Sequence, residues 1–356
     1  MSKIVTIIGA RPQFIKAAAV SREIRNWDDI REIIVHTGQH FDANMSEVFF
    51  EQMDIPKPNY NLGVNSLSHG AMTGQMLEKI EEVLLKEQPD RVVVYGDTNS
   101  TIAGALAAKK LHIKVAHVEA GLRSFNMKMP EEVNRILTDR ISDILFCPTQ
   151  KAVDNLYAEG FENFNSKIVL SGDVMQDAAN FYRDKSVKPI DNLPENYLLA
   201  TIHRAENTDY PEKIKAIFAA FEEIGEELPV VLPLHPRTRK VMEKLSISVD
   251  SRKVVLIEPV GYLEMVWLLT HASMVMTDSG GLQKEAYFFD NFCITLRDET
   301  EWVELIEHSF NVICKAEKQA IIKAYQKSKN IKPDFSVELY GGGKASANIV
   351  DNLTNQ

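Results

Sequence analysis

The feature that most restricts how this chain can fold is a repeated order of short apolar run, polar loop and helix. The run at 3–8 ends in a glycine and a polar turn before a helical pattern at 14–24, and the run at 91–95 leads into an alanine-rich helix. Apolar runs of this length are typical of strands buried on both faces of a parallel sheet, with helices as the crossover connections. The order therefore predicts an α/β fold with doubly wound sheets.

This order occurs on both sides of an interruption at 184–194, where lysines, aspartates and two prolines break the apolar periodicity. Strands are expected at 3–8, 32–36, 91–95, 113–118, 144–146, 167–170, 197–201, 229–234, 254–257, 274–276 and 293–296. Helices are expected at 14–24, 43–53, 69–86, 149–159, 210–224 and 263–271. A chain of 356 residues suits two domains rather than one. We therefore expect two Rossmann-like domains, 1–185 and 186–356, and leave open whether the last helix packs back on the first.

The composition narrows the class of partner. A hydrophobic content of 45% with 25% charged residues is that of a soluble globular protein, and a formal net charge of -10 argues against nucleic acid or an acidic membrane surface as the main partner. Three separated cysteines, Cys147, Cys293 and Cys314, show no metal-ligand spacing, and the first apolar run is too short to span a bilayer. We expect a cytoplasmic protein with buried thiols and no metal site.

The densest group of charged residues follows the strand at 113–118. It comprises Glu119, Arg123, Glu131, Glu132 and Arg135. A proline at 130 is suited to the first position of a helix, so Glu131 and Arg135 lie four residues apart on one helix face. A capped helix start with a surface ion pair would explain any one of these residues. Because ligands of open parallel sheets bind beyond the carboxyl ends of the strands, the group as a whole predicts a functional site there.

Two further strand ends of the first half carry polar side chains. Asp97 follows the strand at 91–95 and could cap the next helix, although residues 98–100 could cap it instead. Arg11 and Lys16 lie in the loop and first turn after the first strand, where free backbone N–H groups favour an anion. Only one glycine stands at that turn, so the three-glycine dinucleotide motif is absent and a nicotinamide cofactor is weakly supported.

The second half carries the pattern of a phosphate site. Ser279, Gly280 and Gly281 follow a strand and open a helix, so a phosphate can approach the backbone closely and meet unpaired N–H groups. Glu285 lies about one turn further on, where its carboxylate could hold the two hydroxyls of a ribose. With the acids concentrated in the first half, this division suits a nucleotide sugar, with its nucleotide mainly on the second domain.

Taken together, the motifs closely resemble the non-hydrolysing UDP-N-acetylglucosamine 2-epimerases over nearly the whole chain. The motifs are GARP at 9–12, GDT at 96–98, HVEAGLR at 117–123, PEEVNR at 130–135, HR at 203–204 and DSGG at 278–281. The resemblance implies a glycosyltransferase-B type of fold, with two Rossmann-like domains facing across a cleft that holds a UDP-sugar. It also implies a homodimer and no cofactor. Hydrolysing relatives have a different loop after the glutamate that corresponds to Glu119, and they lack the PEEVNR motif.

The resemblance also assigns roles to residues of this chain. The catalytic positions are Asp97, Glu119, Glu131 and His203. The UDP or diphosphate positions are Arg11, Lys16, Arg135, Arg204, His235, Tyr262, Ser279, Gly280, Gly281 and Glu285. The sugar positions are Gln39, His40, Arg123, Lys128 and Arg297. The implied reaction eliminates UDP to a glycal and adds it back after C2 is reprotonated on the opposite face.

Three segments are similar to one branch of the family, whose members act on UDP-2,3-diacetamido-2,3-dideoxyglucuronate and make the manno epimer for O-antigen or capsule. They are HTGQHFDANM at 36–45, SFNMKM at 124–129 and RDETEW at 297–302. UDP-N-acetylglucosamine, converted to UDP-N-acetylmannosamine, is the alternative substrate. A retaining glycosyltransferase of the same fold and a non-catalytic nucleotide-sugar sensor are the weaker alternatives from other classes.

Overall fold

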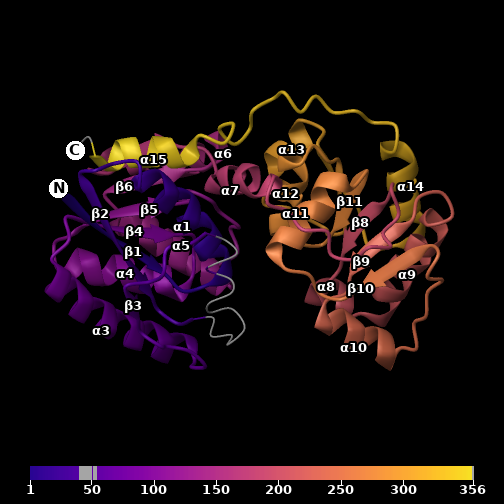
Figure 1. The fold of residues 1–356 in the computed structure, drawn as a ribbon, viewed down its shortest axis with the longest axis horizontal. Coiled ribbons are helices and arrows are strands. Elements are labelled where there is room, and N and C mark those ends of the chain that lie inside the picture. The colour runs from indigo at the N-terminus through magenta and orange to yellow at the C-terminus, as the bar shows by residue number, and fades with distance from the viewer. Residues whose placement is uncertain (40–49, 51–53, 355–356) are drawn as a thin grey trace. The chain divides into compact units, whose positions relative to one another are not determined.

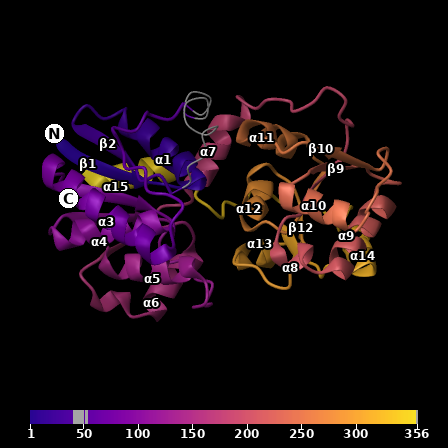
Figure 2. The same ribbon diagram turned by 90° about the horizontal axis from the view of Figure 1, so that it is seen from below.

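The computed structural model of the protein describes residues 1–39, 50 and 54–354. The chain divides into two compact units: unit 1 is Met1–Ala178 with Glu338–Gln356, and unit 2 is Ala179–Val337. The ranges expected from the sequence were 1–185 and 186–356. The last helix, α15 (Ala345–Thr354), belongs to unit 1 and packs against α1 (Arg11–Ile24), and Figure 1 and Figure 2 both show the two helices together.

Within the described residues, unit 1 is built on a seven-stranded sheet in which all neighbours are parallel. Its strands are β1 (Ser2–Ile8), β2 (Ile30–His36), β3 (Tyr60–Asn61), β4 (Arg91–Tyr95), β5 (Lys114–Val118), β6 (Ile144–Cys147) and β7 (Lys167–Leu170). Their order is β3-β2-β1-β4-β5-β6-β7, so the direction of winding reverses between β1 and β4. The loops that leave these two strands therefore diverge and open a crevice at their carboxyl ends.

The helices of unit 1 cover this sheet because its strands are apolar on both faces. Besides α1 and α15 they are α3 (His69–Glu87), α4 (Asn99–Lys110), α5 (Pro130–Ile141), α6 (Gln150–Ala158), the short 3-10 helix η2 (Phe161–Asn163) and the first half of α7 (Val174–Arg183). Val5, Ile7, Val92 and Val94 form one core with the apolar side chains of α3 and α4. A glycine at 104 lets α4 approach the sheet, since a Cβ there would lie 2.7 Å from Cδ1 of Ile7.

Unit 2 repeats the design with a six-stranded parallel sheet in the order β10-β9-β8-β11-β12-β13, counted over the described residues. The strands are β8 (Leu198–Thr201), β9 (Val230–Pro233), β10 (Val254–Ile257), β11 (Met274–Thr277), β12 (Cys293–Thr295) and β13 (Asn311–Ile313). The helices are α8 (Ala205–Thr208), α9 (Pro211–Ile224), α10 (Pro236–Lys244), α11 (Tyr262–His271), α12 (Gly280–Phe288), α13 (Val303–Glu307) and α14 (Lys318–Ser328). Here the winding reverses between β8 and β11.

The register of both sheets brings the polar strand ends to one edge. In unit 1, Ile8 stands opposite His36, and Tyr95 stands opposite Val118. In unit 2, Thr201 stands opposite Thr277, and their hydroxyl oxygens are 2.6 Å apart. The loops that carry the expected site residues therefore start level with one another within each unit.

The all-parallel sheets confirm the α/β doubly wound fold predicted from the apolar runs. The start of α1 was predicted too late: it begins at Arg11, because Pro12 is tolerated in the first turn, and Lys16 consequently lies in the second turn. The sequence pattern missed β3 and β13, which have two and three residues. The helix expected at 43–53 falls, apart from Phe50, outside the described residues. No helix of the described ranges is both long and apolar enough to cross a membrane.

Gly172 offers a test of how the C-terminal segment joins unit 1. Its φ is +87°, and a Cβ there would lie 2.5 Å from the backbone oxygen of Tyr340. Gly172→Ala should therefore destabilise unit 1 by about 1–3 kcal/mol, measured by denaturant unfolding. The matched control is Gly74→Ala in the middle of α3, where a Cβ meets nothing within 4 Å. The control should be stabilising by about 0.5–1 kcal/mol, and equal effects of the two changes would contradict this account.

Candidate active site

Charged side chains alternate in sign along the carboxyl edge of the sheet in unit 1. Lys16 of α1 forms an ion pair with Glu119, which follows β5. Asp97, which follows β4, forms an ion pair with Arg135 of α5, and Arg135 also pairs with Glu132. All five side chains are largely buried, at 1–29% exposure. The structure therefore brings together the acids and cations that the sequence placed at separate strand ends.

The partner of Arg135 within α5 differs from the expected one. The spacing of four residues suggested Glu131, but Arg135 bonds to Glu132, three residues before it. Both spacings lie on one helix face, and tertiary contacts decide between them: Glu132 is buried because it also accepts from the backbone N–H groups of Ser124 and Phe125, at 2.9–3.1 Å. Glu131 is exposed in the first turn of α5, where its carboxylate can face a ligand.

Burial raises the pKa of Asp97 above its ordinary value of 3.8, and the nearby Glu119 adds to this effect. Arg135 and Lys16 oppose it by favouring the ionised form. Asp97 does not cap α4: Thr98 is the N-cap residue, and its hydroxyl accepts from the backbone N–H of Thr101. The Asp97 carboxyl is thus left to the site, with a pKa closer to neutrality than that of an exposed aspartate.

The expected sugar-binding residues of unit 1 have different environments. Oε1 of Gln39 accepts from the backbone N–H and the hydroxyl of Ser100, at 3.1 and 2.8 Å, which places it at the start of α4 beside Asp97. His40 lies outside the described residues. Lys128 is exposed in the loop before α5. The guanidinium of Arg123 is instead buried between Asp139 and Glu159, so its five donors are turned into the protein.

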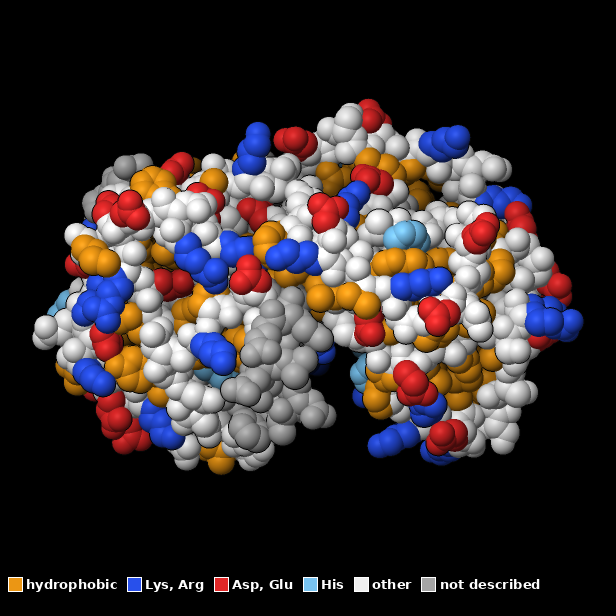
Figure 3. Space-filling model, in the orientation of Figure 1, with side chains coloured by type: hydrophobic (Ala, Val, Ile, Leu, Met, Phe, Trp, Pro, Cys, Tyr) orange, Lys and Arg blue, Asp and Glu red, His pale blue; other side chains and the backbone are white. Residues whose placement is uncertain are grey.

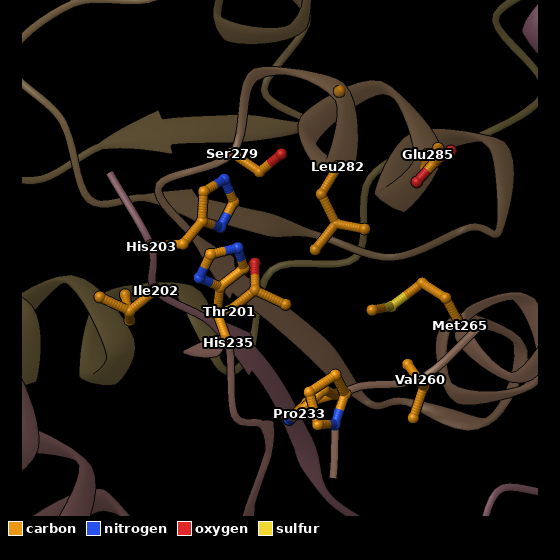
Figure 4. Close-up of a pocket in the computed structure, with 12 residues that line it drawn as sticks. Thr201, Ile202, His203, Pro233, His235, Val260, Met265, Ser279, Leu282 and Glu285 are labelled. Carbon is orange, nitrogen blue, oxygen red and sulfur yellow. The ribbon is translucent and has the colours of Figure 1, made fainter. Parts of the chain in front are cut away.

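Unit 2 has a pocket of about 290 Å³ at the carboxyl ends of β8, β9 and β11. Figure 4 shows the His203 and His235 rings side by side at one end of it, and Ser279, Leu282 and Glu285 on α12 and the turn before it. The ring centroids of the two histidines are 5.3 Å apart. Ser279 is the N-cap residue of α12, but its hydroxyl caps no helix N–H. That hydroxyl and the helix N-terminus are available to an anion.

Asp278 organises this pocket from inside. Its carboxylate is fully buried and accepts from the backbone N–H groups of His203 and Arg204, at 3.0–3.1 Å, and from the Asn207 amide at 3.1 Å. Asp278 therefore ties the loop after β8 to the end of β11, across the point where the winding reverses. Asp278 belongs to the DSGG motif, but no role for it was predicted from the sequence.

Outside the pocket lining, Arg204 and Arg297 lie around the start of α12, and Tyr262 lies at the start of α11. Arg204 reaches Gly280, where a Cβ would lie 3.4 Å from its Nη2. Arg297 forms an ion pair with Glu301 at 2.8 Å. Tyr262 begins α11 and packs its ring edge-on against Tyr182, 5.6 Å away between centroids. Gly281 and Glu285, by contrast, line the pocket itself.

Two buried residues that sequence analysis gave no role hold these loops in place. Gln13 accepts from the backbone N–H groups of Gly9 and Ala10, at 2.8–2.9 Å, and donates to the Tyr95 carbonyl at 2.7 Å, so it joins the ends of β1 and β4. The indole N–H of Trp302 donates to the Gly280 carbonyl at 2.9 Å. A glutamine on an otherwise apolar stretch of α1 is the only signal the sequence offered.

The surface shows why local cations matter for an anionic ligand. Figure 3 shows lysine, arginine, aspartate and glutamate side chains interspersed over the visible face of each unit. Against a net charge of -10, attraction for an anionic ligand must come from cations close to it, such as Arg204 at the start of α12. Across the part of the chain that the structure describes, no three His, Cys, Asp or Glu side chains gather in a way that could hold a metal ion.

These features define a class of protein: a glycosyltransferase-B type fold with acids along the carboxyl edge of the sheet in one α/β unit and a pocket at the switch point of the other. The comparisons with known proteins agree. The family model for UDP-N-acetylglucosamine 2-epimerase matches residues 22–354. The chain belongs to this family, so the family and the enzyme class predicted from the motifs, a non-hydrolysing UDP-sugar 2-epimerase, are confirmed.

Individual relatives cover almost the whole chain. It is 58% identical over 355 residues to the UDP-2,3-diacetamido-2,3-dideoxy-D-glucuronate 2-epimerase of Pseudomonas aeruginosa, covering 99% of both chains. The UDP-GlcNAc 2-epimerase of Methanocaldococcus jannaschii, solved with UDP-GlcNAc and UDP, is similar with a TM-score of 0.83 and 42% identity, over 99% of this chain and 100% of that one. The Neisseria meningitidis enzyme bound to UDP-GlcNAc gives a TM-score of 0.86 and 31% identity, over 99% and 100%.

His203 provides a test of the pocket's electrostatics. Burial lowers its pKa below the ordinary value of 6.5, and His235 and Arg204 add to this, while Asp278 opposes it. The imidazole should therefore titrate below 6.5 in an NMR titration, with its signal assigned by its loss in His203→Asn. Because the unfolded chain then takes up the proton first, this residue should lower stability as the pH falls through 6.5.

A pKa at or above 6.5 for His203 would contradict the account. Asp278→Asn removes the opposing charge and should lower the pKa further.

Proposed function

We propose that this chain is a UDP-2,3-diacetamido-2,3-dideoxyglucuronate 2-epimerase, which inverts C2 of the sugar to give the manno epimer. The observation that carries the proposal is the 58% identity, over 99% of both chains, to the Pseudomonas aeruginosa protein of that name. The loop at 124–129, which resembles that branch, adds support because it starts five residues after Glu119 and ends at the helix of Glu131. A sugar held by those acids would lie close to this loop.

The two units have different roles in this proposal. Unit 2 binds the nucleotide: the N-terminus of α12 with Ser279 takes the diphosphate, and Glu285, on the pocket wall, takes the ribose hydroxyls. Unit 1 supplies Asp97, Glu119 and Glu131 for the chemistry at C2. In unit 2, Arg204 and His203 stabilise the departing diphosphate.

The chemistry starts at C1 because the proton on C2 is not next to a carbonyl and is too weakly acidic to be removed directly. Breaking the bond from C1 to the UDP oxygen builds positive charge on the ring, as in glycoside cleavage, and makes the C2 proton removable. A carboxylate takes this proton and leaves a glycal and UDP. Reprotonation on the opposite face, with return of UDP to C1, gives the epimer. We assign Asp97 as a group able to carry a proton, because burial raises its pKa.

UDP-N-acetylglucosamine is the second candidate substrate. Relatives at 43% and 41% identity, from Methanocaldococcus jannaschii and Methanococcus maripaludis, carry the name UDP-N-acetylglucosamine 2-epimerase. A retaining glycosyltransferase would bind the same donor but would have no use for three acids around C2, and a sensor would need none.

The test of the function is to incubate the protein with each UDP-sugar in deuterated water, without an acceptor, and to follow C2 by NMR. An epimerase introduces deuterium at C2 while the manno epimer forms. Absence of exchange on both sugars would overturn the proposal. Faster turnover of UDP-N-acetylglucosamine would instead reassign the substrate and leave the reaction class in place.

Substitutions of the three acids should impair the reaction but not the binding of the nucleotide. Asp97→Asn, Glu119→Gln and Glu131→Gln should each lower kcat by about 2–4 decades, the scale of general acid–base groups. UDP affinity, measured by calorimetry, should stay nearly unchanged because the nucleotide is assigned to unit 2. Glu78→Gln, an exposed glutamate of α3, is the matched control and should turn over normally. Normal turnover in any of the three would remove that residue from the mechanism.

Lys128 should determine the preference for a uronate. A C6 carboxylate brings a further negative charge towards three carboxylates, and Lys128 is exposed in the bordering loop, whereas Arg123 is engaged with Asp139 and Glu159. Lys128→Met should lower kcat/KM for the uronate by about tenfold or more, and for UDP-N-acetylglucosamine far less. The matched control is Lys151→Met, at an exposed position of α6. Equal losses on both sugars would exclude Lys128 as the carboxylate partner.

The wider setting follows from the same family branch. We infer a homodimer that acts in the cytoplasm on a precursor of O-antigen or capsule. The resemblance to that branch supports this inference, and light scattering of the purified protein tests the assembly state.

A further inference from the structure

A buried network of charged side chains joins the two strand ends that carry Asp97 and Glu119. It consists of His117 on β5, Asp139 on α5, Arg123 in the loop after β5, and Glu159 at the end of α6. The side chains of His117, Asp139 and Arg123 are 0–1% exposed, and that of Glu159 is 34% exposed. We call these four residues the His117 network.

The network contacts the backbone on both sides of the candidate acids. Nε2 of His117 is 2.7 Å from the carbonyl oxygen of Gly96, the residue directly before Asp97. Nδ1 of His117 is 2.7 Å from Oδ1 of Asp139. The other oxygen of Asp139 accepts from the backbone N–H of Gly121, two residues after Glu119, at 3.1 Å. One buried pair of side chains therefore spans the ends of β4 and β5.

Hydrogen bonds join the four side chains of the network to one another and to the backbone. A carbonyl oxygen only accepts, so Nε2 of His117 donates to Gly96. Burial alone would raise the pKa of Asp139, but His117 and Arg123 outweigh it and hold that pKa below 3.8. Nδ1 of the His117 ring lies 2.7 Å from Asp139, so His117 bridges Gly96 and Asp139. The guanidinium of Arg123 donates hydrogen bonds of 2.6–2.8 Å to Asp139 and Glu159.

The backbone held by the network is strained. Glu119 has a φ of +72°, a left-handed conformation that residues with a Cβ rarely adopt. Gly96 and Gly121, at φ values of +64° and +77°, stand on the two strand ends. The Glu119 carboxylate also lies against Gly96, where a Cβ would be 3.2 Å from Oε2. Strain of this kind persists only where the surroundings fix it.

From this geometry we propose that His117 is a positioning residue for the epimerase reaction. Through Gly96 and Asp139 it fixes both strand ends, and so sets the distance and direction of the Asp97 and Glu119 carboxyls towards the sugar. His117 does not touch substrate in this proposal. The proposal rests on the proposed function, because it assumes that the two acids act at C2.

The test is His117→Gln, which can keep a donor for Gly96 but cannot bond Gly96 and Asp139 together. We expect kcat to fall about 10- to 100-fold, because a misplacement of about 1 Å can cost a hundredfold in rate. KM and UDP affinity should change less than twofold, since both depend on the nucleotide site of unit 2. The matched control, His271→Gln at an exposed position of α11, should behave as the wild type.

A double mutant separates positioning from a general loss of structure. Because His117 acts through both acids in this proposal, its effect on kcat should be smaller in the Glu119→Gln background than in the wild type. If His117→Gln folds poorly, Asp139→Asn and Glu159→Gln are milder changes to the same network. Asp139→Asn should lower kcat more than Glu159→Gln, because Asp139 contacts His117 and Glu159 does not.

The outcomes are distinct. Three results would each overturn the positioning role. They are an unchanged kcat in His117→Gln, kcat losses that multiply in full in the double mutant, and kcat values that follow the melting temperature across the series. A wild-type protein that neither epimerises nor exchanges C2 would instead overturn the proposed function.

Discussion

The reversal of winding in each parallel sheet is the constraint on which the rest of the structure depends. In unit 1, Asp97 follows β4 at the reversal and Glu119 follows the neighbouring β5, and in unit 2 the pocket lies at the reversal between β8 and β11. The same topology thus produces two different sites, because the residues after the strands differ. Buried side chains close each reversal: Gln13 joins β1 to β4, and Asp278 joins β8 to β11.

Charge pairing makes the acid-rich edge of unit 1 possible. A lone carboxylate at the burial of Glu119 or Glu132 would be costly, and Lys16 and Arg135 offset that cost. The balance differs at Asp97. Burial and the nearby Glu119 raise its pKa, even though Arg135 favours the ionised form. In the proposed reaction, an acid that is held in place and whose pKa is raised can carry the C2 proton.

Local pattern was enough to predict the fold class and the strand ends, because unbroken apolar runs and helix-start signals act over a few residues. Ser279 at the start of α12 and Pro130 at the start of α5 were found in this way. Contacts between distant segments were not predictable. The choice of Glu132 over Glu131 by Arg135 depends on the loop at 124–125, and the burial of Arg123 depends on Glu159, 36 residues away in sequence.

Inversion at C2 in the proposed reaction requires cleavage of the bond from C1 to UDP, and positional isotope exchange tests that cleavage most directly. The substrate would carry ¹⁸O in the bridge between C1 and the β-phosphate, and ³¹P NMR would follow the label during turnover. Cleavage of the bridge lets the β-phosphate rotate before UDP returns, so the label should spread to its non-bridging oxygens as the epimer forms. Epimerisation with the label confined to the bridge would contradict the account.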